Sequence, residues 1–164
     1  MVGKLPRVNR KLLGIYLNDH LAGSVVGTRL ARRIAKHNEG NHYGSEASRL
    51  AEEIQQDQAA LEALMDRLDV RKKMFRRVAA AVAETAGRLK PNGKMVGYSP
   101  LSRVIELEGL TIGITGKLEL WQSLKVTGES VNGVDVDQLI ERAEDQRQRA
   151  KELRLRAARE AFAA

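Results

Sequence analysis

The sequence predicts an all-α protein, and three observations carry this prediction. Helix breakers fall in few places, and the stretches between them are rich in Ala, Leu, Arg and Glu, which favour helices. Several of these stretches carry apolar residues at heptad-like spacing, as amphipathic helices of a bundle do. β-branched residues cluster only at 104–115 and 131–136, without the polar and apolar alternation of a half-buried strand.

The positions of the breakers divide the chain into five predicted helices. They span about 10–37, 45–68, 70–90, 100–125 and 135–162. Ser45 is expected to cap the second helix and Asp69 the third. Ser99 followed by Pro100 fits the N-cap and the first residue of the fourth. The fourth helix is apolar over most of its circumference, which predicts the most buried position.

The lengths of the connections predict a topology for a single domain that covers 1–164. Short turns make the first and second helices antiparallel neighbours, and likewise the fourth and fifth. The third helix, at about 1.5 Å per residue, is roughly 30 Å long and reaches from one end of the bundle to the other. Two antiparallel hairpins joined by a fifth, crossover helix form the arrangement of ferritin-like folds.

The order of long helices resembles the ferritin-like superfamily, and GYSPLSRVIELEGL at 97–110 is similar to uncharacterised bacterial helical-bundle proteins placed near it. The metal-binding members carry a Glu on each of two helices and a Glu-x-x-His pair on each of the other two. Neither His20 nor His37 follows a Glu by three positions, and the pair of Glu39 and His42 lies in a turn. The resemblance therefore implies the fold and argues against the superfamily's di-iron chemistry.

Polar residues inside the apolar stripes are the candidate site residues, because a buried polar group has to be satisfied or functional. We expect a buried polar core with one residue from each long helix: His20, Asp57, Glu108 and Gln146. On the fourth helix, the helical wheel assigns the solvent side to Arg103, Glu106, Gly113 and Lys117. The preferred interpretation is buried hydrogen bonds or an ion pair that set the helix register, with no catalytic residue and no cofactor.

A metal site is the alternative interpretation of these polar residues. Carboxylate and imidazole ligands suit Fe, Mn or Zn. Position along the bundle axis separates Glu108 from His20 by roughly 18 Å at 1.5 Å per residue, whereas Glu119 lies near the level of His20. The alternative metal set is therefore His20, Asp57 and Glu119.

Two further sequence patterns carry expectations about packing and partners. Glycines on the first and fourth helices predict close helix packing: Gly23, Gly27, Gly109, Gly113 and Gly116. Basic residues crowd the start of the predicted third helix, against the helix dipole, and are candidates for binding nucleic acid or another polyanion: Arg71, Lys72, Lys73, Arg76 and Arg77. A solvated face paired with Glu62, Asp66 and Asp69 is the alternative for this cluster.

Composition and missing motifs narrow the function. The 28 Lys and Arg residues outnumber 21 Asp and Glu residues, and the absence of cysteine excludes disulfides, thiolate metal sites and cysteine nucleophiles. The nucleotide-binding, serine-hydrolase and zinc-protease motifs are missing. No signal peptide and no membrane-length apolar stretch is recognised, so we expect a cytoplasmic protein.

These observations favour a non-catalytic ferritin-like bundle that serves as a structural or protein-interaction module. We expect a homo-oligomer or a complex with a protein partner. A divergent metal-binding protein and a nucleic-acid-binding protein are the alternatives.

Overall fold

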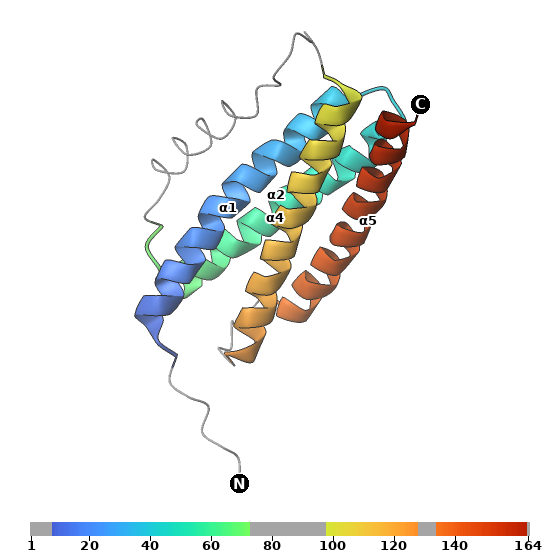
Figure 1. The fold of residues 1–164 in the computed structure, drawn as a ribbon. Helices are drawn as coiled ribbons and strands as arrows, with labels where there is room; N and C mark the ends of the chain where they lie inside the picture. Colours follow the sequence, from blue (N-terminus) through green and yellow to red (C-terminus); the bar gives the residue numbers. More distant parts are fainter. Residues whose placement is uncertain (1–7, 73–97, 128–133, 164) are drawn as a thin grey trace.

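The computed structural model describes residues 8–72, 98–127 and 134–163. These residues form four long helices and no strand (Figure 1): α1 (Arg10–His37), α2 (Gly44–Arg67), α4 (Pro100–Val126) and α5 (Val136–Phe162). The all-α prediction is confirmed for this part of the chain. Residues 70–72, the start of the predicted third helix, are not helical, and the rest of that helix lies outside the described residues.

Side-chain caps set the starts of three of these helices. Asn9, Ser99 and Asp135 each accept a hydrogen bond from the backbone N–H three residues further on. The cap leaves one fewer unpaired donor in the first helical turn. Ser99 is followed by Pro100 at the first helical position, as predicted.

The start of α2 depends on a close approach of backbone rather than on the predicted side-chain cap. The helix begins at Gly44, so Ser45 lies inside its first turn. A Cβ at position 44 would lie 2.4 Å from the carbonyl oxygen of Asn38, which only glycine avoids. Oδ1 of Asn41 holds the turn by accepting a hydrogen bond from the N–H of Tyr43 at 2.8 Å.

Asp69 ends α2 and does not cap a following helix. Its φ of 53° lies in the left-handed region, whereas an N-cap residue needs an extended conformation. The N–H of Val70 donates to the carbonyl oxygen of Met65 at 2.9 Å, the hydrogen bond of a Schellman motif. The predicted cap at this position is therefore wrong.

The four helices pack as two antiparallel hairpins, α1 with α2 and α4 with α5 (Figure 1). The helix α1 also lies beside α4, and α2 contacts α5. Asn18, near the start of α1, donates to the carbonyl oxygen of Arg71, just past the end of α2. Arg103, in the first turn of α4, donates instead to Asn38 at the end of α1. The end of α2 and the start of α4 therefore lie at opposite ends of the bundle.

The apolar core is divided into two clusters along the bundle axis. The cluster nearer the α1–α2 turn includes Tyr43, Leu50 and Leu107. The cluster at the other end includes Leu64 and Trp121. Polar side chains occupy the level between the two clusters, and this level holds the candidate site.

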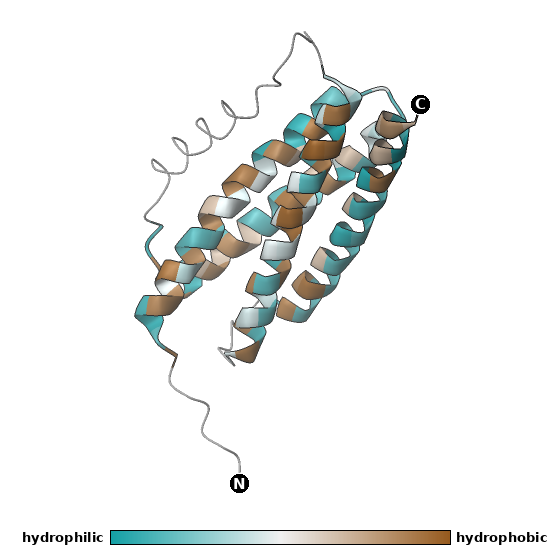
Figure 2. Ribbon diagram, viewed as in Figure 1, coloured by the Kyte–Doolittle hydropathy of each residue, from teal (hydrophilic) through white to brown (hydrophobic). Residues whose placement is uncertain are grey.

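The outward side of α4 is apolar, and part of it is exposed to solvent. Leu101, Ile105 and Ile112 are 50%, 45% and 66% exposed. Figure 2 shows brown, apolar segments on the side of α4 that faces the viewer, whereas the visible side of α5 is largely teal.

Of the helices that the structure describes, none has both the length and the apolar character required to cross a membrane.

Candidate functional site

Two of the predicted polar core residues, Asp57 on α2 and Gln146 on α5, are buried and in contact. They are 3% and 0% exposed. Nε2 of Gln146 donates to Oδ2 of Asp57 at 3.1 Å. The two side chains thus join the two hairpins at the level between the apolar clusters.

Lys117 of α4 and Arg142 of α5 complete this arrangement. The ammonium of Lys117 donates to Oδ2 of Asp57 and to Oε1 of Gln146. The guanidinium of Arg142 pairs with Oδ1 of Asp57. Each carboxylate oxygen of Asp57 therefore faces a cation. We call these four residues, Asp57, Lys117, Arg142 and Gln146, the polar centre.

A ladder of charges continues from the polar centre along α2 and α5. Gln146 also donates from Nε2 to Oε2 of Glu53 at 3.1 Å. The guanidinium of Arg149 pairs with Glu53, with Glu46 at 2.7 Å and with Asp145 at 2.7 Å. Opposite charges alternate along this side of the bundle, so each charge has a partner within reach.

Burial acts on Lys117, whose side chain is 15% exposed. Removal from water lowers the pKa of its ammonium from 10.5, and the Asp57 carboxylate acts in the opposite direction. Breaking a buried ion pair by removing one partner destabilises a protein by about 3–5 kcal/mol. The charged form of Lys117 in this core therefore depends on Asp57.

The predicted orientation of α4 is wrong. Glu108, expected in the core, is exposed, whereas Glu106 and Lys117, expected in solvent, turn inward. Glu106 is 7% exposed, and its Oε1 accepts from Nε of Arg33 at 2.7 Å. Because α4 is apolar on almost every side, the pattern of hydrophobic residues does not show which side of the helix faces the core. Pairing with Asp57 and Arg33 on other helices decides which side faces inward.

The structure does not bring together the residues of the alternative metal set. His20 is half-buried, with its ring edge-on to Tyr16 at 4.5 Å between centroids, while Glu119 is exposed on the outer side of α4. Burial lowers the pKa of His20 from 6.5, and Asp19 acts in the opposite direction. No three His, Asp or Glu side chains within the described ranges are placed to hold a metal ion.

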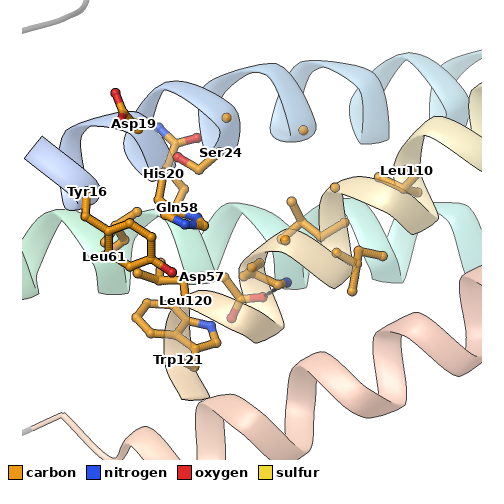
Figure 3. Close-up of a pocket in the computed structure, with 17 residues that line it drawn as sticks. Tyr16, Asp19, His20, Ser24, Asp57, Gln58, Leu61, Leu110, Leu120 and Trp121 are labelled. Atoms are coloured by element: carbon orange, nitrogen blue, oxygen red, sulfur yellow. Dashed lines mark hydrogen bonds and ion pairs between the residues drawn. The ribbon is translucent and has the colours of Figure 1, made fainter. Parts of the chain in front are cut away.

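A cavity of about 450 Å³ lies beside the polar centre, between α1, α2 and α4 (Figure 3). Its lining is mostly apolar, with Leu61 and Leu120 among the residues that contribute. His20 from α1, Asp57 from α2 and Trp121 from α4 also line it. Figure 3 shows these side chains converging from three helices on one space. Cavities of this size and composition are typical small-molecule sites.

Glycines line the side of the cavity between α1 and α4, and they do not provide the expected close packing. A Cβ would meet no heavy atom of the described chain within 4 Å at four positions: Gly23, Gly27, Gly113 and Gly116. Only Gly109 has a neighbour, Leu30, at 3.5 Å. Each glycine costs about 1 kcal/mol of helix propensity relative to alanine. Packing among the described residues does not account for that cost.

A second polar cluster closes the end of the bundle at the α1–α2 turn. Asn38 is fully buried, accepts from Nε of Arg103 at 2.7 Å and donates to the hydroxyl of Tyr98 at 3.2 Å. The guanidinium of Arg103 lies 4.6 Å from the centroid of the Tyr43 ring. Burial raises the pKa of Tyr43 and of Tyr98 to about 12. Helical periodicity misses this cluster because Asn38, Tyr43 and Tyr98 lie outside the helices.

The structure describes only the first two residues of the predicted basic cluster. Arg71 is exposed, and Nζ of Lys72 pairs with Oδ2 of Asp66 at 2.9 Å. That pair agrees with the alternative of a solvated, paired face. Lys73, Arg76 and Arg77 lie outside the described residues, so polyanion binding stays a prediction.

No protein-family model, curated protein sequence or solved structure matches this chain.

Proposed function

We propose that this chain is a non-catalytic helical bundle of ferritin-like architecture that acts as an interaction module and associates with a second copy of itself. The two antiparallel hairpins, and the opposite placement of the end of α2 and the start of α4, support this architecture.

The polar centre supports a role without a metal ion. A carboxylate in a bundle core binds a metal through oxygens that are free to coordinate. Both oxygens of Asp57 already pair with cations, Lys117 and Arg142, and these positive charges oppose the entry of Fe, Mn or Zn. The ammonium of Lys117 therefore takes the place of a metal ion between α2, α4 and α5.

One observation carries the interaction role, namely the apolar outer face of α4. Leu101, Ile105 and Ile112 lie on one side of the helix, at spacings of four and seven residues, and each is at least 45% exposed. The exposed carboxylates of Glu108 and Glu119 share this side. We call these five residues the outer face. An apolar stripe flanked by charges is typical of a protein–protein interface.

Charge complementarity favours a second copy as the partner. Gly109 of α4 lies next to Leu30 of α1, so the exposed Arg29 is at the level of the exposed Glu108. In a twofold dimer each surface contacts the same surface of the other copy. Glu108 on α4 and Arg29 on α1 of one chain then face Arg29 and Glu108 of the other.

Sedimentation velocity of the full chain tests this proposal. We expect a dimer for the wild type and a monomer for Ile105→Glu, which places a carboxylate in the apolar part of the outer face. Leu155→Glu on α5, where the leucine is 42% exposed, is the matched control and is expected to leave the dimer intact. Circular dichroism checks that all three proteins remain helical.

A wild-type chain that sediments as a monomer throughout the micromolar range would overturn self-association. A dimer that persists in Ile105→Glu and dissociates in Leu155→Glu would also overturn it, because the interface would then lie on α5.

A further inference from the structure

We infer that the cavity between α1, α2 and α4 is a binding site for a planar, uncharged, apolar molecule that carries one hydrogen-bond acceptor. This inference goes beyond self-association, because it concerns the interior of a single chain and not its outer face.

Trp121 supplies the first observation. Its side chain is fully buried, it lines the cavity, and its Nε1 has no hydrogen-bond partner among the described residues. In Figure 3 the indole ring bounds the cavity, with its nitrogen on the edge that faces Asp57 in this view. A buried indole N–H normally finds a partner. A ligand acceptor in the cavity would satisfy it.

The glycines supply a second, independent observation. Gly27 on α1 and Gly116 on α4 line the cavity, and a Cβ at either position would meet nothing in the described chain within 4 Å. Glycine weakens a helix and is retained where another group approaches the backbone closely. A flat molecule lying against the two helix backbones provides such a group. Gly23 and Gly113 are exposed, so the cavity is open to solvent between α1 and α4.

Hydrogen bonds within the protein already use three other polar side chains of the cavity lining, those of Tyr16, Ser24 and Gln58. The hydroxyl of Tyr16 donates to Ser123 at 3.2 Å, and that of Ser24 donates to the carbonyl oxygen of Leu21 at 2.8 Å. Gln58 uses both ends of its amide, accepting from Thr28 and donating to Glu62. Trp121 therefore offers a donor that a ligand can use without breaking an existing bond.

The chemistry of the lining selects the ligand class. The walls are mostly apolar, which favours an uncharged molecule with a hydrophobic body. Lys117, which lines the cavity, is already paired with Asp57, so an anionic ligand would have to break the polar centre. An indole N–H donates only, so its partner on the ligand has to be an acceptor, such as a carbonyl oxygen or a ring nitrogen.

Quinoline and naphthalene are suitable probes, because they share shape and size and differ in one ring nitrogen that accepts a hydrogen bond. Ligand-observed NMR titrations with the full chain at neutral pH give a dissociation constant for each. We expect both to bind the wild type, and quinoline to bind about fivefold more tightly, as one net hydrogen bond implies.

Two variants test separately the hydrogen bond donated by Trp121 and the unfilled volume of the cavity. Trp121→Phe keeps an aromatic ring and removes the donor, so the two probes are expected to bind it equally. Gly27→Leu fills the cavity and is expected to abolish binding of both. Ala63→Leu, at an exposed position of α2, places the same leucine side chain elsewhere and is the matched control, with wild-type binding.

Absence of binding to the wild type, or full binding to Gly27→Leu, would overturn the site. Equal affinity of the two probes for the wild type would overturn the role of Trp121. If Trp121→Phe does not fold, the comparison of Gly27→Leu with Ala63→Leu still decides whether the cavity is the site. The oligomeric state has no bearing on these outcomes, because Ile105→Glu is expected to bind quinoline as the wild type does.

Discussion

The two sides of the bundle at its middle level differ in how they are filled. On the side toward α5, the long polar side chains of Lys117, Arg142 and Gln146 close around Asp57. On the side toward α1, at the same level, a cavity of about 450 Å³ is lined mostly by apolar residues and glycines. One side is complete within the chain, and the other leaves room for a further molecule.

Neighbouring positions on α4 create this difference. Both Gly116 and Lys117 line the cavity, but the ammonium of Lys117 is paired with Asp57 and Gln146, and Gly116 offers no side chain to fill the space. Gly113, one turn earlier, also lines the cavity. The helix α4 thus contributes the charged side chain of Lys117 to the polar centre, whereas its glycines leave the space toward α1 unfilled. Buried polarity alone therefore does not identify a binding site, because a site also needs unfilled volume.

The largest expected effect on stability comes from removing the carboxylate of the polar centre. Asp57→Ala removes the carboxylate that pairs with Lys117 and Arg142 and leaves buried positive charge without a partner. We expect a loss of about 3–5 kcal/mol in the free energy of unfolding, measured by urea denaturation. Glu108→Ala, which removes an exposed carboxylate of α4, is the control, with an expected change below about 0.5 kcal/mol. Equal losses in the two variants would contradict the observed orientation of α4.

A smaller effect is expected where glycine is required by a close contact. Gly44→Ala places a Cβ 2.4 Å from the carbonyl oxygen of Asn38. The backbone at the start of α2 has to shift, so we expect a loss of about 1–3 kcal/mol. The urea midpoint measures it, and an unchanged midpoint would show that the turn accommodates a methyl group.

Alanine substitutions of the glycines that line the cavity are expected to stabilise the protein. A Cβ at Gly27 or Gly113 meets no described atom, so each alanine gains helix propensity without a clash. We expect each substitution to raise the free energy of unfolding by about 1 kcal/mol. A loss at both positions would indicate that the described cavity is filled in solution.

The smallest expected effect is a dependence of stability on pH through His20, which lines the cavity. Burial lowers the pKa of His20 from 6.5, so the unfolded chain binds this proton more readily than the folded one does. Stability contributed at His20 is therefore present above pH 6.5 and decreases as the pH falls below it toward the folded-state pKa. His20→Gln is expected to lessen the drop in urea midpoint between about pH 7.5 and about pH 5. An identical drop in the two proteins would place His20 in solvent.

Much of the fold follows from local sequence. Ser99 and Pro100 mark the start of α4, and the apolar stripes place Asp57 and Gln146 in the core. These signals depend on neighbouring residues and on helical periodicity. Sequence reasoning fails at the start of α2, because the contact between Gly44 and Asn38 depends on the path of the turn.

The candidate site is less predictable than the fold, because it depends on contacts between helices. Lys117 lies on a helix that is apolar nearly all round, and only the carboxylate of Asp57 on another helix shows which way it turns. Gly23 and Gly27 have the spacing of a close helix contact, yet they line a cavity. The spacing alone does not distinguish these outcomes, since both depend on what the facing helix presents.

The most direct test of the difference between the two sides uses the indole N–H of Trp121, the only tryptophan of the chain. Its resonance in a proton–nitrogen correlation spectrum is resolved from the backbone and reports hydrogen bonding at Nε1. Saturation with quinoline is expected to move the indole proton to lower field, whereas naphthalene is expected to produce no such displacement. An indole resonance that stays in place at saturating quinoline, or that moves equally with both probes, would contradict the assignment of the open side as a ligand site.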